Sequence, residues 1–297
     1  MTFLNRLFRD KMAACSAAVV SLVVVAGLLA PWFAPHDPFA VRMELRYAGP
    51  SWSYWLGNDQ LGRCVLSRLI YGIRPSVLWV LAALASTVAI GAIVGLLAGY
   101  FRGVTDAVLM RACDVMLSFP GYVMTLAMIG ILGVGLDKMM IAIVVSKWAW
   151  FARVIRTSVM HIAENDYVKF AKAIGASPLT IMFRHVVPVS LPDIAVISSS
   201  SFGSMILQLS GFSFLGLGIQ APNPEWGMML NEARGVMFSK PELMLAPGLA
   251  IIVVVCAINW LSDSLQTALD PKLIGSKPDR KQRAFRFPGT IRGREAA

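Results

Sequence analysis

The sequence is poor in charge and in the residues that bind metals or nucleotides. Only 15% of its 297 residues are Asp, Glu, Lys or Arg, against roughly 25% in soluble domains. Its three histidines, His36, His161 and His185, are far apart, and its four cysteines form no C-x-x-C pair. The G-x-x-x-x-G-K-[ST] loop that cradles nucleotide phosphates is absent. These gaps predict no metal site, no disulfide, no cofactor and no ATP hydrolysis by this chain.

Apolar residues take the place of the missing charge. They make up 57% of the chain, and a helix that crosses a bilayer needs roughly 20 largely apolar residues in succession. Six windows of about this size are present: 12–34, 76–100, 115–136, 139–155, 191–217 and 243–265. The sequence therefore predicts an all-α, polytopic membrane protein with about six transmembrane helices.

The first window could also be a cleaved signal peptide, because Arg6, Arg9 and Lys11 precede it. The apolar region of a signal peptide has about 7 to 15 residues. The window 12–34 is longer and ends in aromatic residues typical of a membrane interface, Trp32 and Phe33. We therefore expect a transmembrane helix there.

Positive charge indicates the orientation, because short loops rich in Lys and Arg stay in the cytoplasm. Most of the 27 Lys and Arg residues fall at 6–11, 102–111, 153–184 and 272–294. Both termini are therefore predicted to be cytoplasmic. The charge is spread over loops and a tail rather than over one folded face, which favours contact with anionic lipid over nucleic acid.

This orientation divides the chain into five parts. They are a cytoplasmic N-terminus at 1–11, a first helix at 12–34, an extracytoplasmic loop at 35–75, a core of five helices at 76–271, and a basic, disordered cytoplasmic tail at 272–297.

A polar segment at 158–188 interrupts the apolar windows. Its first half carries apolar residues at helical spacing: Tyr167, Phe170, Ala171 and Ile174. Gly175 suits a helix end with a positive φ, and Ser177 followed by Pro178 suits the start of a second helix. The segment is predicted to be a helix-turn-helix. Taken alone, it could be a solvated connector, a DNA-binding element or a docking surface for a cytoplasmic partner.

The same segment resembles the EAA loop of ABC importer permeases, E-A-A-x3-G-x9-I-x-L-P. Ala171, Gly175 and Pro188 match at the right spacing, whereas Lys169 and Phe170 replace the glutamate and the first alanine. The resemblance implies that this loop docks on a separate ATPase subunit. It points to these docking residues: Tyr167, Lys169, Phe170, Ala171, Gly175, Ser177 and Pro188.

Further segments resemble the peptide/nickel family of these permeases. They are LGNDQLGR at 56–63, SRLIYG at 67–72, SFLGLG at 213–218, PNPEWG at 222–227 and LDP at 269–271. Asn58 and Cys64 depart from the family pattern. Segments 147–156 and 224–234 look closest to the nickel branch.

The resemblance implies a type I ABC importer permease in the bacterial inner membrane, which forms half of a translocation path. It also implies a second permease subunit, ATPase subunits and an extracytoplasmic solute-binding protein as partners. The expected cargo is nickel or a nickel chelate, with di- or oligopeptides as the alternative.

Polar residues crowd the fifth window, where contact with lipid would be costly. We expect a path lined by Ser200, Ser204, Gln208 and Asn259, although small residues also serve close helix packing. The loop 220–242 is expected to face the binding protein, or to be a structural lid held by Pro222 and Pro224. The residues expected to face that partner are Glu225, Trp226, Asn231, Glu232 and Arg234.

Two other classes of protein fit the sequence less well. A secondary transporter would show inverted repeats, and none is found, although Phe119-Pro120 and Gly216 to Gly218 interrupt spans. A membrane enzyme would need acid, base or metal-binding residues that converge within the spans, and the sequence offers no such set.

Overall fold

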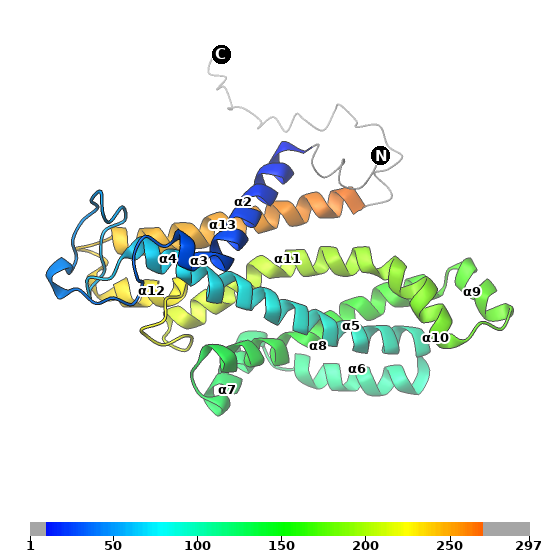
Figure 1. Cartoon of the computed structure of the whole chain (residues 1–297). Coiled ribbons are helices and arrows are strands. Elements are labelled where there is room, and N and C mark those ends of the chain that lie inside the picture. Colours follow the sequence, from blue (N-terminus) through cyan, green and yellow to red (C-terminus); the bar gives the residue numbers. More distant parts are fainter. Residues whose placement is uncertain (1–9, 270–297) are drawn as a thin grey trace, which may run out of the picture.

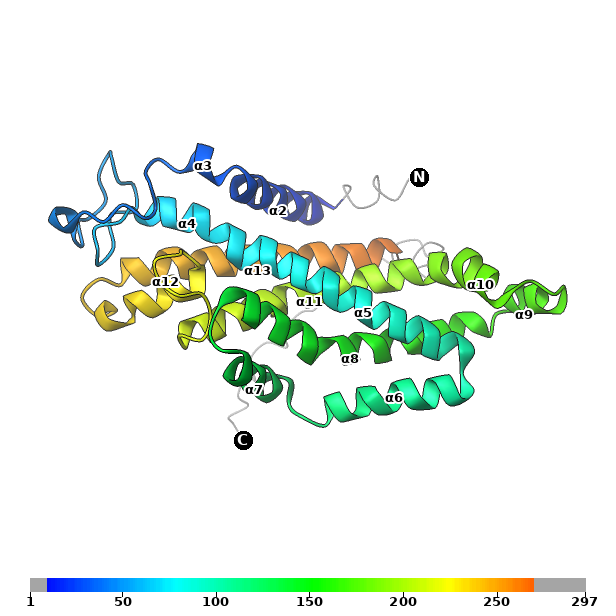
Figure 2. The same cartoon turned by 60° about the horizontal axis from the view of Figure 1, so that its bottom comes forward.

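Long helices lie side by side in an elongated bundle, as Figures 1 and 2 show for the computed structural model, which describes residues 10–269. The long helices are α2 (Lys11–Leu28), α5 (Val80–Phe101), α6 (Gly103–Leu117), α8 (Leu136–Ala163), α11 (Val187–Phe214) and α13 (Glu242–Leu269). The short helices are α3 (Ala30–Phe33), α4 (Val65–Ile73), α7 (Gly121–Leu132), α9 (Asp166–Ala173), α10 (Pro178–Ile181) and α12 (Trp226–Ala233). Single turns are η1 (Met43–Leu45), η2 (Arg74–Trp79), η3 (Met182–Val186) and η4 (Arg234–Val236). The all-α prediction is confirmed over residues 10–269, which contain no strand.

Four helical stretches of the described chain are long and apolar enough to cross a membrane: Lys11–Leu28, Val65–Phe101, Pro178–Phe214 and Glu242–Leu269. The pair α6 and α7 adds a fifth if it counts as one span. The predicted window 139–155 lies within α8, where Lys147, Arg153 and Arg156 interrupt the apolar run. The count of six therefore stays a prediction. The predicted tail at 272–297 and nearly all of the N-terminal segment 1–11 fall outside the described residues.

The single helix predicted at 115–136 is wrong. The chain breaks between α6 and α7, and the two helices meet at an angle of 82°. Pro120 has no amide hydrogen for a helical bond. The last turn of α6 is already tightened, because the Ser118 amide donates to Val115 at 3.3 Å and the Ser118 hydroxyl to the carbonyl of Asp114 at 2.7 Å. Gly133, with φ of 90°, ends α7. Proline and glycine therefore divide this apolar run into a bent pair.

The segment 35–75, predicted to be an extracytoplasmic loop, is partly helical. From Val65 the chain is already helical, and α4 continues through η2 into α5. Pro75 lies in η2, a π-helical turn. Such a turn shifts the hydrogen-bond ladder locally and accommodates a residue without an amide hydrogen. The result is one helix of 37 residues.

Glycines allow α5 to pack closely on α8. Gly91, Gly95 and Gly99 recur every four residues, so they lie on one face of α5. A Cβ at Gly95 would lie only 2.7 Å from the carbonyl oxygen of Ala152 on α8, and one at Gly99 would lie 2.8 Å from that of Arg156. Small residues of this kind let the backbones of membrane helices approach each other. This contact forms the centre of the bundle (Figure 2).

Adding one methyl group at this contact tests its importance. We expect Gly95→Ala to destabilise the chain by about 1–3 kcal/mol, because the new Cβ overlaps the backbone of α8. Gly130→Ala is the matched control, since no atom lies within 4 Å of its added Cβ and alanine favours a helix. The measurement is the apparent melting temperature in detergent. Equal melting temperatures for the two variants would contradict the close contact.

Candidate functional site

The helix-turn-helix lies at one end of the bundle, where the chain passes from α8 to α11 (Figure 1). Gly175 has φ of +80° and follows α9. The amide of Ala176 donates to the carbonyl of Ala171 at 3.1 Å, which closes the helix end. Ser177 caps α10 by accepting from the amide of Thr180 at 3.2 Å. The predicted turn and second helix start are therefore present.

The helix-turn-helix leaves large apolar side chains uncovered. They are Phe170 on α9, Ile174 directly after it, Leu179 on α10 and Phe183 on η3, and each is between 58% and 67% exposed. These four residues are called the hairpin face below. Val168, Ala171 and Ile181 are buried on the inner side instead. Exposed apolar residues of this size are typical of an interaction surface.

The predicted docking residues divide between the exposed and the buried side of the helix-turn-helix. Six of the seven are exposed: Tyr167, Lys169, Phe170, Gly175, Ser177 and, in the first turn of α11, Pro188. Ala171 is the exception, because it packs into the core. Its match to the family pattern therefore reflects packing within this chain.

Charged contacts hold the helix-turn-helix to the bundle. Arg102, between α5 and α6, donates to the Glu164 carboxylate at 2.8 Å and lowers the pKa of Glu164 below its ordinary value. The Lys172 ammonium lies 5.3 Å from the centre of the Tyr100 ring. The helix-turn-helix is thus anchored to the end of α5.

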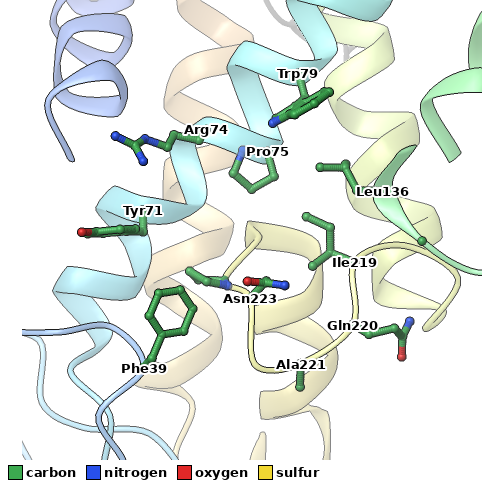
Figure 3. Close-up of a pocket in the computed structure, with 12 residues that line it drawn as sticks. Phe39, Tyr71, Arg74, Pro75, Trp79, Leu136, Ile219, Gln220, Ala221 and Asn223 are labelled. Carbon is green, nitrogen blue, oxygen red and sulfur yellow. The ribbon is translucent and has the colours of Figure 1, made fainter. Parts of the chain in front are cut away.

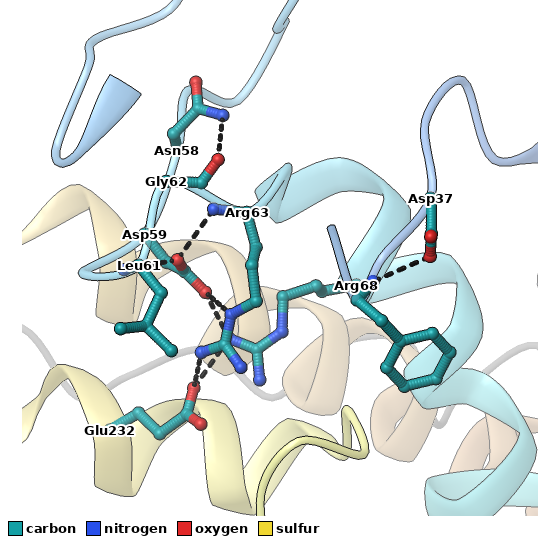
Figure 4. Close-up of polar contacts among 9 residues, drawn as sticks. Asp37, Asn58, Asp59, Leu61, Gly62, Arg63, Arg68 and Glu232 are labelled. Carbon is teal, nitrogen blue, oxygen red and sulfur yellow. Dashed lines mark hydrogen bonds and ion pairs between the residues drawn. The ribbon is translucent and has the colours of Figure 1, made fainter. Parts of the chain in front are cut away.

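Four charged side chains form a buried cluster at the opposite end of the bundle (Figure 4). Asp59 accepts from Arg63 at 2.7 Å and from Arg68 at 2.5 Å. Both arginines also contact Glu232 on α12, at 3.0 and 2.6 Å. None of the four side chains is more than 10% exposed. We call these residues the ion cluster.

The ion cluster joins segments far apart in the chain. Asp59 and Arg63 belong to LGNDQLGR and Arg68 to SRLIYG, while Glu232 lies more than 160 residues later. A buried ion pair is costly to break, because the remaining charge is left without a partner. The cluster therefore fixes α12 against α4 and the loop before it.

Glu225 and Trp226, expected to face a binding protein, are buried. The Glu225 carboxylate accepts from the Ser76 hydroxyl at 3.0 Å and from the amides of Gly227 and Met228, both at 2.9 Å. The Trp226 indole donates to the carbonyl of Leu69 at 3.0 Å. The prediction was wrong for this pair, since both side chains hold α12 to α4 and η2.

The other residues of that prediction also make internal contacts. Asn231 donates to the carbonyl of Phe214 at 2.6 Å, and Glu232 belongs to the ion cluster. Arg234 is exposed, and its guanidinium lies 5.9 Å from the centre of the Phe214 ring. Of the five residues, Arg234 is the one whose charge is open to solvent.

The residues expected to line a path fall into two groups. Ser200 and Ser204 on α11 and Asn259 on α13 are exposed along the bundle, and the Ser200 hydroxyl bonds that of Ser262 at 2.7 Å. Gln208 is only 3% exposed, and its amide donates to Thr125 on α7 at 3.2 Å. It therefore packs inside the chain instead of lining its outer surface.

An apolar cavity of about 420 Å³ opens between α4, η2 and the loop 219–224 (Figure 3). Aromatic and aliphatic side chains line it: Phe39, Tyr71, Trp79, Leu136 and Ile219. Arg74 points away from it, because its guanidinium donates to the carbonyls of Gly27 and Leu28 at the end of α2. Sequence reasoning missed this cavity, because its walls come from four separate segments.

Comparison with known proteins agrees with this architecture. Residues 91–275 match the family of binding-protein-dependent transport system inner membrane components. Residues 2–50 match the N-terminal transmembrane domain of oligopeptide transport permease C. The permease of the MetNI methionine ABC transporter, in an inward-facing structure, superposes with a TM-score of 0.58 at 15% identity, over 68% of this chain and 97% of that one. That structure supports the fold alone.

Curated relatives cover nearly the whole chain. The metal-staphylopine import system permease CntC of Staphylococcus aureus is 54% identical over 92% of this chain and 94% of the relative. The nickel transport permease NikC of Escherichia coli is 36% identical over 86% and 92%. The glutathione transport permease GsiD of Pectobacterium atrosepticum is 38% identical over 91% and 90%.

The chain therefore belongs to the binding-protein-dependent inner membrane components: it is a multi-pass permease subunit of an ABC importer. Within that class it is a member of the peptide/nickel family, as the sequence resemblance predicted. It is a transport component of the inner membrane rather than an enzyme, and this family works with a separate ATPase and a binding protein.

Removing one charge from the ion cluster tests its role. We expect Glu232→Gln to lower the free energy of unfolding by about 3 kcal/mol or more, because Arg63 and Arg68 then share only the Asp59 carboxylate in a buried site. Glu242→Gln is the control, since Glu242 makes an exposed pair with Lys240 at 3.8 Å. The measurement is the apparent melting temperature of the purified chain. A melting temperature equal to that of Glu242→Gln would contradict the account.

Proposed function

We propose that this chain forms half of the translocation path for a metal chelate, together with a second permease subunit, and that its hairpin face docks on the ATPase. The hairpin face carries the proposal. Four large apolar side chains stand uncovered there, on an element anchored to α5 and α8 by the contacts of Lys172 and Arg102. Motion of a docked partner would therefore reach the long helices directly.

The outer side of α11 supports a path shared with a second subunit. Ser200, Ser204, Leu207 and Gly211 are exposed at spacings of four, three and four, so they form one stripe along the helix. Asn259 on α13 lies close by, with its side-chain oxygen 2.8 Å from where a Cβ on Gly203 would lie. The hydroxyls of Ser200 and Ser204 already bond within the bundle, but an amide such as that of Asn259 needs further partners in a membrane. A second permease or a wet path would supply them.

The substrate proposal rests on the relatives. The metal-staphylopine permease is 54% identical to this chain, against 36% for the nickel permease and 38% for the glutathione permease. Ser200, Ser204 and Asn259 offer neutral hydrogen-bonding groups, which suit a metal already wrapped by a chelator. Nickel or a related metal in chelated form is therefore the proposed cargo, and a short peptide is the second candidate that the glutathione relative favours.

Shortening the hairpin face tests the proposed docking. We expect Phe170→Ala with Phe183→Ala to lower ATP-driven uptake at least tenfold, because apolar contact area with the ATPase is lost. Membrane insertion and melting temperature should stay unchanged. Ile131→Ala, at an 80% exposed residue of α7, is the control. Normal uptake by the double variant would contradict the docking role.

The cargo is tested with the assembled transporter and its cognate solute-binding protein. We expect Ni(II) with an opine-type chelator to stimulate ATP hydrolysis through the binding protein, and free Ni(II), glutathione and dipeptides to do so weakly. The measurement is phosphate release in nanodiscs at graded ligand concentration. If glutathione or dipeptides stimulate ATP hydrolysis and the Ni(II) chelate does not, the cargo is a peptide.

A further inference from the structure

Residues 34–64 form a cap on the end of the bundle opposite α9 and α10 (Figure 1). Backbone bonds make the cap compact: Arg42 donates to Leu61 at 3.1 Å, Tyr47 to Asp59 at 3.1 Å and Asn58 to Ala48 at 2.9 Å. The ion cluster ties its base to α12. Given the proposed docking of α9 and α10 in the cytoplasm, the cap faces the outside.

Two tryptophans stand out from the cap. Trp52 is 97% exposed and Trp55 is 69% exposed. They lie in a tight turn at 51–55, the Trp turn, in which Ser51 and Tyr54 exchange backbone hydrogen bonds at 2.9 and 3.1 Å. The Trp55 indole donates to the carbonyl of Trp52 at 3.1 Å. These exposed aromatic side chains are therefore held by an ordered backbone.

Tyr54 fixes the Trp turn to the cap. Its ring stacks on His36 with centroids 4.4 Å apart. Its hydroxyl accepts from the Arg42 guanidinium at 3.0 Å. A surface that is rigid before binding loses little conformational entropy when a partner arrives.

The Trp turn lies beyond the reach of lipid headgroups. The Arg74 guanidinium binds the last carbonyls of α2, Gly27 and Leu28, and so marks the outer boundary of the spans. Helix α4 has nine residues and extends the bundle by about 14 Å past Arg74 at 1.5 Å per residue. The headgroup layer adds only about 5–8 Å on each side of the apolar core.

The Trp turn is attached at the far end of this extension. The amide of Val65, the first residue of α4, donates to the carbonyl of Gly57 at 3.1 Å. The turn at 51–55 precedes Gly57 by a few residues, so it is held at the level of Val65 rather than of Arg74. Trp32, which is 88% exposed next to α2, lies nearer to the membrane and suits the interface belt.

We propose that the Trp turn is the docking site of the extracytoplasmic solute-binding protein, in place of the buried residues Glu225 and Trp226. Tryptophan, tyrosine and arginine dominate the binding energy of protein interfaces, and the turn presents Trp52 and Trp55 beside Arg42. The exposed charges of the cap are balanced, with Arg42 and Arg46 against Asp37 and Glu44, but Arg42 is the one that contacts the turn, through the Tyr54 hydroxyl. The partner surface is therefore an apolar recess for the two indoles, with a carboxylate that meets Arg42. This inference rests on the proposed function.

The test uses the assembled transporter in nanodiscs and titrates the ligand-loaded binding protein while ATP hydrolysis is measured. Trp52→Ala and Trp55→Ala are each expected to raise the half-saturating concentration of the binding protein at least tenfold. The rate of ATP hydrolysis without the binding protein should equal that of the native transporter. Trp52→Phe should restore part of the affinity, because it keeps an aromatic ring, and Trp32→Ala should match the native transporter.

Two results would overturn the inference. One is a half-saturating concentration unchanged by Trp52→Ala and Trp55→Ala. The other is a cross-link to lipid from a photoreactive side chain placed at position 52 of the assembled transporter, which would place the turn in the membrane. Failure of the proposed function looks different, because then the binding protein would not stimulate the native transporter at all.

Discussion

The architecture depends on buried charges that must find partners. Asp59 binds two arginines, Arg63 and Arg68, and both reach Glu232 on α12. In surroundings that exclude water, each of these charges would be costly alone. Satisfying them draws the cap, α4 and α12 into one rigid unit, and Glu225 adds a second link to Ser76. The outer end of the bundle is therefore a fixed platform, on which the Trp turn is presented.

The two ends of the molecule differ in what they leave exposed. At one end, the charged side chains of the ion cluster are buried and paired with one another, and the Trp turn is exposed. At the other, local rules shape the helix-turn-helix and the hairpin face stays uncovered. Between them, the glycines of α5 bring α8 within backbone contact, so the core is closely packed. Such a body suits a subunit that moves as a unit when partners act on its ends.

Sequence reasoning succeeded where the cause is local. Gly175 and Ser177 determine a helix end and a helix start within a few residues, and both were predicted. It failed where the partner is distant. Glu225 was expected to face the binding protein and Gln208 to line the path. Both are buried, and the residues that bond them, Ser76 and Thr125, lie 149 and 83 residues away. The interruption at Phe119-Pro120 was predicted, but the 82° bend between α6 and α7 was not, because hydropathy alone does not distinguish one straight span from a broken pair.

The central claim is that the hairpin face transmits the work of a separate ATPase to this chain. The most direct measurement places a photoreactive side chain at Phe170 in the assembled transporter and identifies what it cross-links. We predict that the group at Phe170 cross-links to the ATPase subunit. The same group placed at Ile131 should give no cross-link to the ATPase. A cross-link to lipid or to the second permease alone, with uptake intact, would contradict it.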